Sequence, residues 1–157
     1  MILTCLLAFA SAATVPVAEI RGGVVRGIVG YPDLVGGELG AHLGGWHLGL
    51  GYSNIIIVNS VFVRGGPEWV VSSTERDRGL SVLLFSPSVE YRAYTHSHLA
   101  AIQHGGSITA GLELIEPLGG GWIADLRLDA GAVYLFDSIL LPHVRLSFGF
   151  GVVPNAR

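Results

Sequence analysis

The stretch GWIADLRLDAGAVYLF, which spans Gly121–Phe136, constrains the fold of this chain more than any other part of the sequence. Its even positions from 122 to 134 are all apolar, whereas the odd positions between them include two aspartates and an arginine. Successive side chains of a β-strand point to opposite faces, so a period of two predicts a strand. This strand requires an apolar environment on one side and a polar environment on the other.

Similar alternation recurs along the chain and predicts an all-β fold of eight strands. No segment has a sustained helical period. The charge-free stretch 43–63 contains four glycines and a run of β-branched residues, which favour a strand over a transmembrane helix. We place the strands near residues 17–30, 34–43, 46–57, 79–86, 88–97, 106–116, 121–135 and 142–152.

The composition is typical of a folded chain in apolar surroundings. Of the 157 residues, 50% are hydrophobic and 13% are charged, and this charged share is about half that of an average globular domain. The length is sufficient for one domain and too short for two. Because the net charge is −3 and no basic run is present, no nucleic-acid partner is expected.

The predicted connections alternate in length. Short turns are expected at 44–45, 86–88 and 117–121 and longer connections at 58–78, 98–105 and 136–141, with 31–33 as a short exception. Outer-membrane barrels have short periplasmic turns and longer extracellular loops, and an even strand count leaves both termini on the short-turn side. We therefore predict a closed antiparallel up-and-down transmembrane β-barrel, with loop 58–78 as a contact surface for an extracellular or envelope protein.

The parity of the strands assigns one set of side chains to the barrel interior. An arginine that faces lipid costs about 2–4 kcal/mol at mid-bilayer, so the charged faces are expected to point inward. The interior of an eight-stranded barrel is just wide enough for side chains to fill it, which predicts a salt-bridged polar network and no open pore. The predicted interior network consists of Glu38, His42, His47, Glu90, Arg92, Glu113, Asp125, Arg127, Asp129, His143 and Arg145.

Two predicted strands do not follow this parity. In strand 17–30, Ile20 and Val24 are expected to face lipid, and Arg26 would then follow them outward. A bulge at Gly22–Gly23 would return Arg26 to the interior. Strand 79–86 is apolar on both faces and gives no assignment.

Aromatic residues on the apolar faces predict the two borders of a membrane. Trp122 and Tyr134 share a face and are 12 residues apart. At roughly 3.3 Å per residue and a tilt near 40°, this separation corresponds to roughly 30 Å, close to the apolar band of a membrane barrel with its girdles. The predicted aromatic girdle consists of Trp46, Trp122, Tyr134, Phe148 and Phe150.

The alternating strands GWIADLRLDAGAVYL and PHVRLSFGFGV resemble those of the small eight-stranded outer-membrane barrels, the class of the OmpA transmembrane domain and OmpX. The resemblance covers about residues 15–152 and depends on architecture, because no signature motif accompanies it. It implies a barrel in the outer membrane of a Gram-negative bacterium, with outer-membrane lipid as its partner.

The N-terminal segment is uncharged and is typical of a secretory signal peptide. Ala10-Ser11-Ala12 is a small-x-small cleavage site, so we expect a signal peptide over residues 1–12 and a barrel domain over 13–157. An uncleaved anchor is the alternative, although the 18 uncharged residues barely reach across a bilayer. Cys5 lies in this segment, so the mature domain would contain no thiol.

The cluster YTHSHLAAIQHGG at 94–106 is the main candidate for chemistry. His96 and His98 share a strand face, and His104 could fold back towards them, but no nearby carboxylate completes a metal site. No metal or cofactor is therefore expected. Ser97 permits the hypothesis of a hydrolase resembling the lipid A deacylases, but the His-x-Ser spacing of that family is absent, so no catalytic residue is assigned.

These features predict a non-enzymatic integral outer-membrane protein that is structural or interacts through its longer loops. Two alternatives stay open. One is the lipid-modifying hydrolase, and the other is a secreted soluble lipocalin-like barrel, whose apolar faces would turn inward around a ligand. Extraction from cell envelopes without detergent would favour the soluble barrel.

Overall fold

The computed structural model of the chain describes residues 20–55, 58–96, 102–135 and 139–153, and all regular secondary structure in these ranges is β-strand. The strands are β1 (Arg21–Tyr31), β2 (Val35–Leu43), β3 (Trp46–Ile55), β4 (Val58–Pro67), β5 (Trp69–Arg76), β6 (Gly79–Phe85), β7 (Ser88–His96), β8 (Ile102–Gly119), β9 (Trp122–Leu135) and β10 (Ile139–Val152). In the described part of the chain, no helix is long and apolar enough to cross a membrane. The predicted signal segment 1–12, with Cys5, lies outside the described residues.

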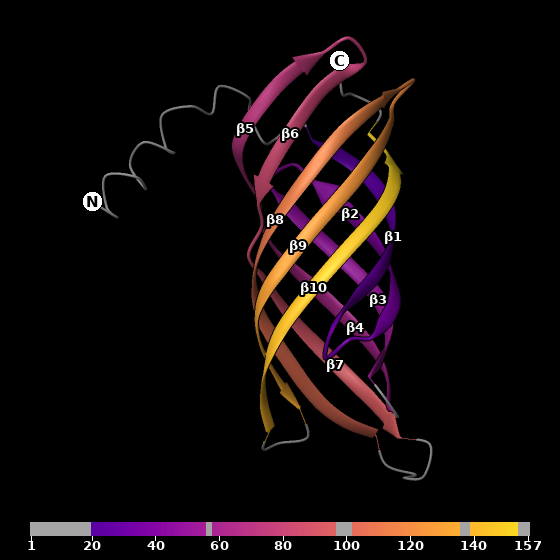
Figure 1. Cartoon of the computed structure of the whole chain (residues 1–157), viewed down its shortest axis with the longest axis vertical. Helices are drawn as coiled ribbons and strands as arrows, with labels where there is room; N and C mark the ends of the chain where they lie inside the picture. Colours follow the sequence, from indigo (N-terminus) through magenta and orange to yellow (C-terminus); the bar gives the residue numbers. More distant parts are fainter. Residues whose placement is uncertain (1–19, 56–57, 97–101, 136–138, 154–157) are drawn as a thin grey trace, which may run out of the picture.

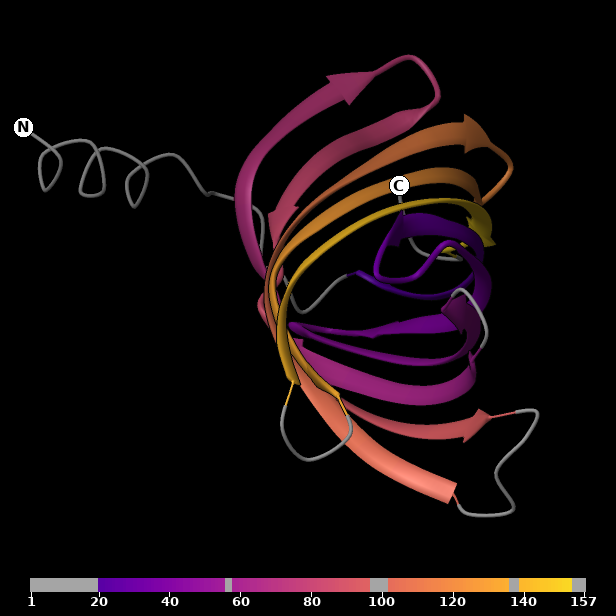
Figure 2. The ribbon, with the colours of Figure 1, turned by 60° about the horizontal axis from the view of Figure 1, so that its bottom comes forward.

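The strands close into an antiparallel barrel (Figures 1 and 2). Around the barrel the order is β8–β7–β4–β3–β2–β1–β10–β9, and β9 pairs again with β8 to complete the ring. β5 continues in the direction of β4, and β7 continues in the direction of β6. Each of these pairs counts as one passage of the chain along the barrel, so the ten strands make eight passages. The prediction of a closed antiparallel eight-stranded barrel is confirmed.

The segment 58–78 forms strands and a tight turn, so the prediction of a long loop was wrong. β4 pairs with β3 on one side and with β7 on the other, and β5 pairs with β6. The inward face of β4 includes Val58 and Phe62, which are buried, while Val61 and Val63 on its outward face are exposed. Because both faces carry apolar residues, the alternation in polarity that marks a half-buried strand is missing.

The predicted turn at 86–88 was also wrong. The strands predicted on either side of it, 79–86 and 88–97, follow each other along one edge of β8, as β6 and β7. Between them, Ser86 and Gly111 exchange backbone hydrogen bonds of 2.8 and 3.2 Å, which keep this part of the chain in the sheet. The two errors compensate, and the number of passages remains eight.

β1 follows a regular register and does not contain the bulge expected at Gly22–Gly23. Ile20, Val24 and Arg26 are all buried, whereas Val25 is exposed. The outward assignment of Ile20 and Val24 was therefore wrong. Apolar side chains also occupy parts of the barrel interior, so an apolar face is not always the outer face.

The β5–β6 hairpin projects beyond the barrel at the end where β1 begins and β10 ends (Figure 1). Its inner face packs against the barrel through a set of buried apolar residues that we call the terminal cluster: Ile20, Val70, Val82, Leu84, Ile115, Ile123 and Val153. The charged tip of the hairpin, Glu75–Arg78, is exposed. Part of the segment predicted as an extracellular loop thus lies at the end of the termini.

The opposite end of the barrel has short connections in its described part. β8 begins at Ile102 and β10 at Ile139, so much of the predicted loops 98–105 and 136–141 belongs to strands. A second apolar set, the distal cluster, lies inside the barrel at this end and consists of Val58, Tyr94, Val133 and Leu135. The two clusters bracket the polar interior along the barrel axis.

The outer wall is apolar. Leu39, Leu48, Leu126 and Leu146 are examples of its many large hydrophobic residues, each between 43% and 61% exposed. Among the described residues, the exposed charged side chains are confined to Arg21, where β1 begins, and the hairpin tip. The barrel therefore has its polarity reversed relative to a water-soluble protein.

Candidate functional site

The barrel interior contains a dense set of ionisable side chains, which we treat as the candidate site. All eleven residues predicted to face inward are buried. The structure adds four charged residues that the sequence interpretation placed in connections or on the outer face: Arg26, Asp33, Arg64 and Glu68. Together they give twelve buried charged side chains and three buried histidines.

Six of these side chains form a closed ring of alternating charge, the ionic ring. Its members, in order, are Arg26, Glu38, Arg64, Asp129, Arg127 and Glu113, and Glu113 pairs back to Arg26. They come from β1, β2, β4, β8 and β9. Ion pairs in the ring include Arg26–Glu38 at 2.7 Å, Arg64–Asp129 at 2.6 Å and Arg127–Glu113 at 3.0 Å. Each member contacts at least two opposite charges, which offset the cost of its burial.

Two further contacts fix the ring within the barrel. Arg26 donates a bidentate pair of hydrogen bonds to Asp125, of 2.6 and 3.0 Å. Arg127 donates to the Ser86 carbonyl at 3.0 Å and to the Ser88 hydroxyl at 2.7 Å. The ring is thus tied to the point where β6 passes into β7.

Glycines on the inner wall make room for these side chains. A Cβ atom at Gly40 would lie 2.6 Å from the Arg26 guanidinium, and one at Gly49 would lie 2.8 Å from the Glu38 carboxylate. Such distances are shorter than carbon–nitrogen or carbon–oxygen van der Waals contact. Small residues at these positions therefore allow long charged side chains to cross a narrow interior.

A second group of charges, the distal group, lies nearer the other end and is centred on Asp33. This residue follows β1 and is fully buried. It accepts hydrogen bonds from Arg92 and from Arg145, the latter at 2.9 Å, and its Oδ2 is 3.2 Å from a ring nitrogen of His143. Burial alone would raise the pKa of Asp33, but the hydrogen bonds from Arg92 and His143 and the charges of both arginines lower it far below its usual value.

Phe62 lies at the centre of the distal group. The guanidinium groups of Arg92 and Arg145 are 5.2 and 4.7 Å from its ring centroid, distances typical of cation–π contacts. Both arginines also pair with Glu90. This group has two arginines and two acids, so its charges balance.

A third group, the rim cluster, consists of His42, His47 and Glu68. His42 and His47 flank the β2–β3 turn, and the backbone N–H of Glu68 donates to the Gly45 carbonyl in that turn at 2.9 Å. His42 Nδ1 is 2.9 Å from Glu68 Oε1, and His47 Nε2 is 3.0 Å from the Ser88 hydroxyl. The rim cluster lies between the ionic ring and the end of the barrel that carries the termini.

The histidine-rich segment that suggested chemistry is not assembled into a site in the described residues. His104 is exposed on β8, where its Nδ1 lies 2.6 Å from the hydroxyl of Tyr91 and the two rings stack. Ser97 and His98 lie outside the described residues, and His96 is described only as the end of β7.

The predicted girdle residues all lie on the outer wall. Trp46, Trp122, Phe148 and Phe150 are each more than half exposed and lie towards the end of the termini, and Tyr134 lies near the other end. Trp69 was missed by the sequence interpretation, because it belongs to the segment assigned to a loop. It is exposed and stacks on Phe85 with ring centroids 5.8 Å apart.

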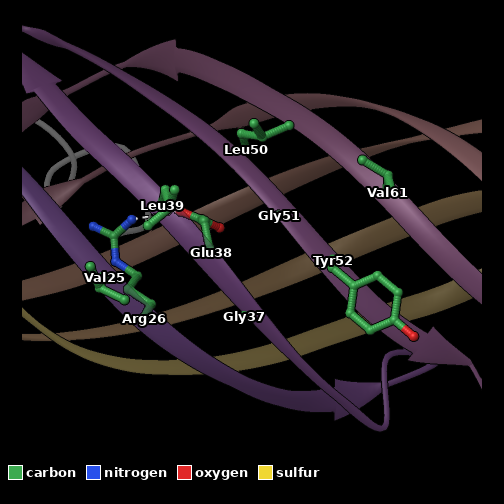
Figure 3. A pocket seen from close by; sticks show the side chains of 9 residues that line it. All are labelled: Val25, Arg26, Gly37, Glu38, Leu39, Leu50, Gly51, Tyr52 and Val61. Carbon is green, nitrogen blue, oxygen red and sulfur yellow. Dashed lines mark hydrogen bonds and ion pairs between the residues drawn. The ribbon is translucent and has the colours of Figure 1, made fainter.

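A hollow of about 440 Å³ lies on this wall over β1, β2, β3 and β4, and Figure 3 shows the side chains that line it. Val25, Leu39, Leu50 and Val61 line it, and Arg26 and Glu38, joined by a dashed line, are the ion pair behind it. Its lining is almost entirely apolar. A hollow of this kind fits a hydrocarbon chain better than a polar ligand.

Sequence comparison finds no family profile that matches this chain and no curated protein that matches it. Among solved structures, it is similar to the N-terminal β-barrel domain of OprF from Pseudomonas aeruginosa. The TM-score is 0.50 and the sequence identity 16%, over 85% of this chain and 96% of that domain. At this identity the likeness shows the fold alone. The architecture is thus that of the small eight-stranded outer-membrane barrels.

Proposed function

We propose that this protein is an integral outer-membrane β-barrel with a closed, salt-bridged interior. Export through a signal peptide at 1–12 would bring it to the envelope. The observation that carries the proposal is the reversed polarity of the barrel, with an apolar outer wall and twelve buried charged side chains inside. In water the exposed hydrophobic wall would be unfavourable, whereas in a bilayer it is solvated by acyl chains.

The borders of the wall support the same placement. Tryptophan and phenylalanine lie near the end of the termini, and Tyr31, Tyr52, Tyr91 and Tyr134 lie exposed near the opposite end. Aromatic girdles of this kind occupy the two interfaces of a membrane barrel. We propose that lipid acyl chains cover the wall between them and fill the hollow at Leu39 and Leu50.

The interior supports a structural role and not a conducting one. Ion pairs such as Arg26–Glu113 and Arg64–Asp129 link strands that are distant in sequence, and an apolar cluster lies towards each end of the polar region. The secreted lipocalin-like alternative requires an apolar interior that holds a ligand, which this arrangement of charges disfavours. We propose that the barrel is an anchor without an open pore.

The contact surface of this anchor is the β5–β6 hairpin. Its exposed tip has two acids and two arginines, Glu75, Arg76, Asp77 and Arg78. A mixed-charge tip at the end of the termini would face the periplasm in an outer-membrane barrel. We therefore propose that its partner is an envelope protein on the periplasmic side. This replaces the expectation of a partner that binds 58–78 as an extracellular loop.

Envelope fractionation and a heat-modifiability gel test the membrane proposal. We expect the protein in the detergent-extracted outer-membrane fraction, with a different gel mobility before and after boiling. Recovery in a soluble fraction without detergent would contradict it. Planar-bilayer recording of the purified barrel tests the closed interior, and a reproducible ion conductance would contradict the proposal of a closed barrel.

A further inference from the structure

The charges of the barrel interior do not balance, and the imbalance is local. The distal group is neutral, because Arg92 and Arg145 offset Asp33 and Glu90. The remaining buried charges comprise three arginines and five acids: Arg26, Arg64, Arg127, Glu38, Glu68, Glu113, Asp125 and Asp129. With neutral histidines, an excess of two negative charges thus lies in the ionic ring and the rim cluster.

Such an excess is unfavourable inside a barrel. A buried charge is tolerated when it is paired or coordinates a metal, and an uncompensated one costs several kcal/mol. One divalent cation would supply both missing positive charges. Two added protons would also do so, and the experiment below separates these two possibilities.

The ligands for a cation are present at the same place. His42, Glu68 and Glu113 each offer one ligand atom, and these atoms lie within 4.8 Å of one another. His42 Nε2 is 3.4 Å from Glu113, and His47 Nδ1 is 3.9 Å from Glu68. All four residues are at most 2% exposed.

Three atoms of this cluster are buried without a hydrogen bond: His42 Nε2, His47 Nδ1 and Glu68 Oε2. Buried polar atoms are normally satisfied, so their coincidence with the excess negative charge indicates a ligand. Imidazole nitrogens combined with carboxylate oxygens suit zinc and related transition metals better than magnesium or calcium.

We propose that the rim cluster, together with Glu113 of the ionic ring, binds a divalent transition-metal ion of the zinc type through His42, Glu68 and Glu113. The ion connects β2 and β8 with the junction of β4 and β5. It lies at the level of the β2–β3 turn. Its role is structural, because it neutralises the interior and joins elements that are distant in sequence.

Refolding of the full chain in detergent tests this site. Because the ligands are buried, the ion is best supplied during folding, so the urea-unfolded protein is refolded at pH 7.5 with zinc or with EDTA. Folded barrel is identified by heat modifiability, and zinc is measured by elemental analysis after unbound metal is removed. We expect one zinc per folded barrel and a higher midpoint of thermal unfolding in zinc than in EDTA.

Two substitutions and one control assign the ligands. His42→Gln and Glu68→Gln each remove one ligand while keeping a polar side chain, and each should weaken zinc affinity about tenfold or more. His104→Gln changes an exposed histidine on the outer wall and should leave the affinity unchanged. If His42→Gln does not fold, Glu68→Gln alone decides the assignment.

The proposal is overturned if the folded wild-type barrel retains no zinc and is equally stable in zinc and EDTA, since the excess charge is then neutralised by protons. It is also overturned if zinc binds with unchanged affinity to Glu68→Gln, or if the loss occurs in His104→Gln instead.

Discussion

Arg26 is the residue on which the ionic ring depends most, so Arg26→Met is the most informative single perturbation. Methionine keeps an unbranched side chain in the lumen but removes the guanidinium. Arg26 pairs with Glu38, Glu113 and Asp125. After its loss, Glu38 still pairs with Arg64 and Glu113 with Arg127.

Asp125 would be left without an arginine. The remaining cationic candidate beside it among the described residues is His42, whose Nε2 is 3.9 Å away. Removal of one partner from a buried ion pair typically costs about 3–5 kcal/mol, because the other charge stays buried and uncompensated. We expect Arg26→Met to lower the free energy of unfolding by about that amount, most of it through Asp125.

Urea unfolding of the refolded barrel, followed by tryptophan fluorescence and heat modifiability, measures this change. Adding Asp125→Asn to Arg26→Met removes the stranded charge and should recover about 1–3 kcal/mol. Arg76→Met, at the exposed hairpin tip, is the control and should change stability by no more than about 0.5 kcal/mol. A cost below about 1 kcal/mol for Arg26→Met, or no recovery in the double variant, would refute the reasoning.

Three further predictions concern the wall, the acid response and the inner glycines. Leu128→Arg, in the middle of β9, should lower the free energy of unfolding in lipid vesicles by about 2–4 kcal/mol, whereas Leu128→Ala should cost much less; equal losses in urea titrations would contradict a lipid-facing wall. The folded-state pKa of Asp33 lies below its ordinary value of 3.8, so its contribution to stability is present above that pH and is lost as the pH falls further. When the free energy of unfolding is measured at decreasing pH, it should therefore decline less steeply for Asp33→Asn than for the wild type. Gly49→Ala places a Cβ atom 2.8 Å from the Glu38 carboxylate and should lower the free energy of unfolding by about 1–3 kcal/mol. Gly27→Ala is the control, because the nearest atom to its Cβ would lie at 3.9 Å, and it should leave stability almost unchanged. Equal thermal midpoints for the two variants would show that the inner wall is not crowded.

The parts of the barrel that sequence reasoning located correctly are those where polarity alternates strictly. β9 carries charges at three successive inward positions, and β10 alternates polar or small residues with large apolar ones, so the parity of Arg127 and Arg145 is unambiguous. The physical reason is the large free-energy difference between a charge in lipid and a paired charge in the lumen.

The parts that it missed are those where the interior itself is apolar. β4 places Phe62 inside the barrel and Val61 on the outer wall. Because hydrophobic residues lie on both faces of this strand, the sequence does not distinguish the inner face from the outer face. Because 58–78 was predicted to be a loop, Arg64 in β4 was not assigned to the barrel interior. Glu68, which lies between β4 and β5, was missed for the same reason. Asp33 was missed for another reason: its carboxylate reaches the lumen from a turn, and turn residues carry no parity.

The sequence alone determined the fold class and the inward face of most strands, because a period of two with charges on one side leaves few environments that satisfy both faces. Only the tertiary structure decided that 58–67 lies in the barrel wall, that the β5–β6 hairpin after it projects at the end of the termini, and which arginine meets which carboxylate. Closure of the barrel brings strands from opposite ends of the chain to within a few ångströms, and no local pattern in the sequence records those distances.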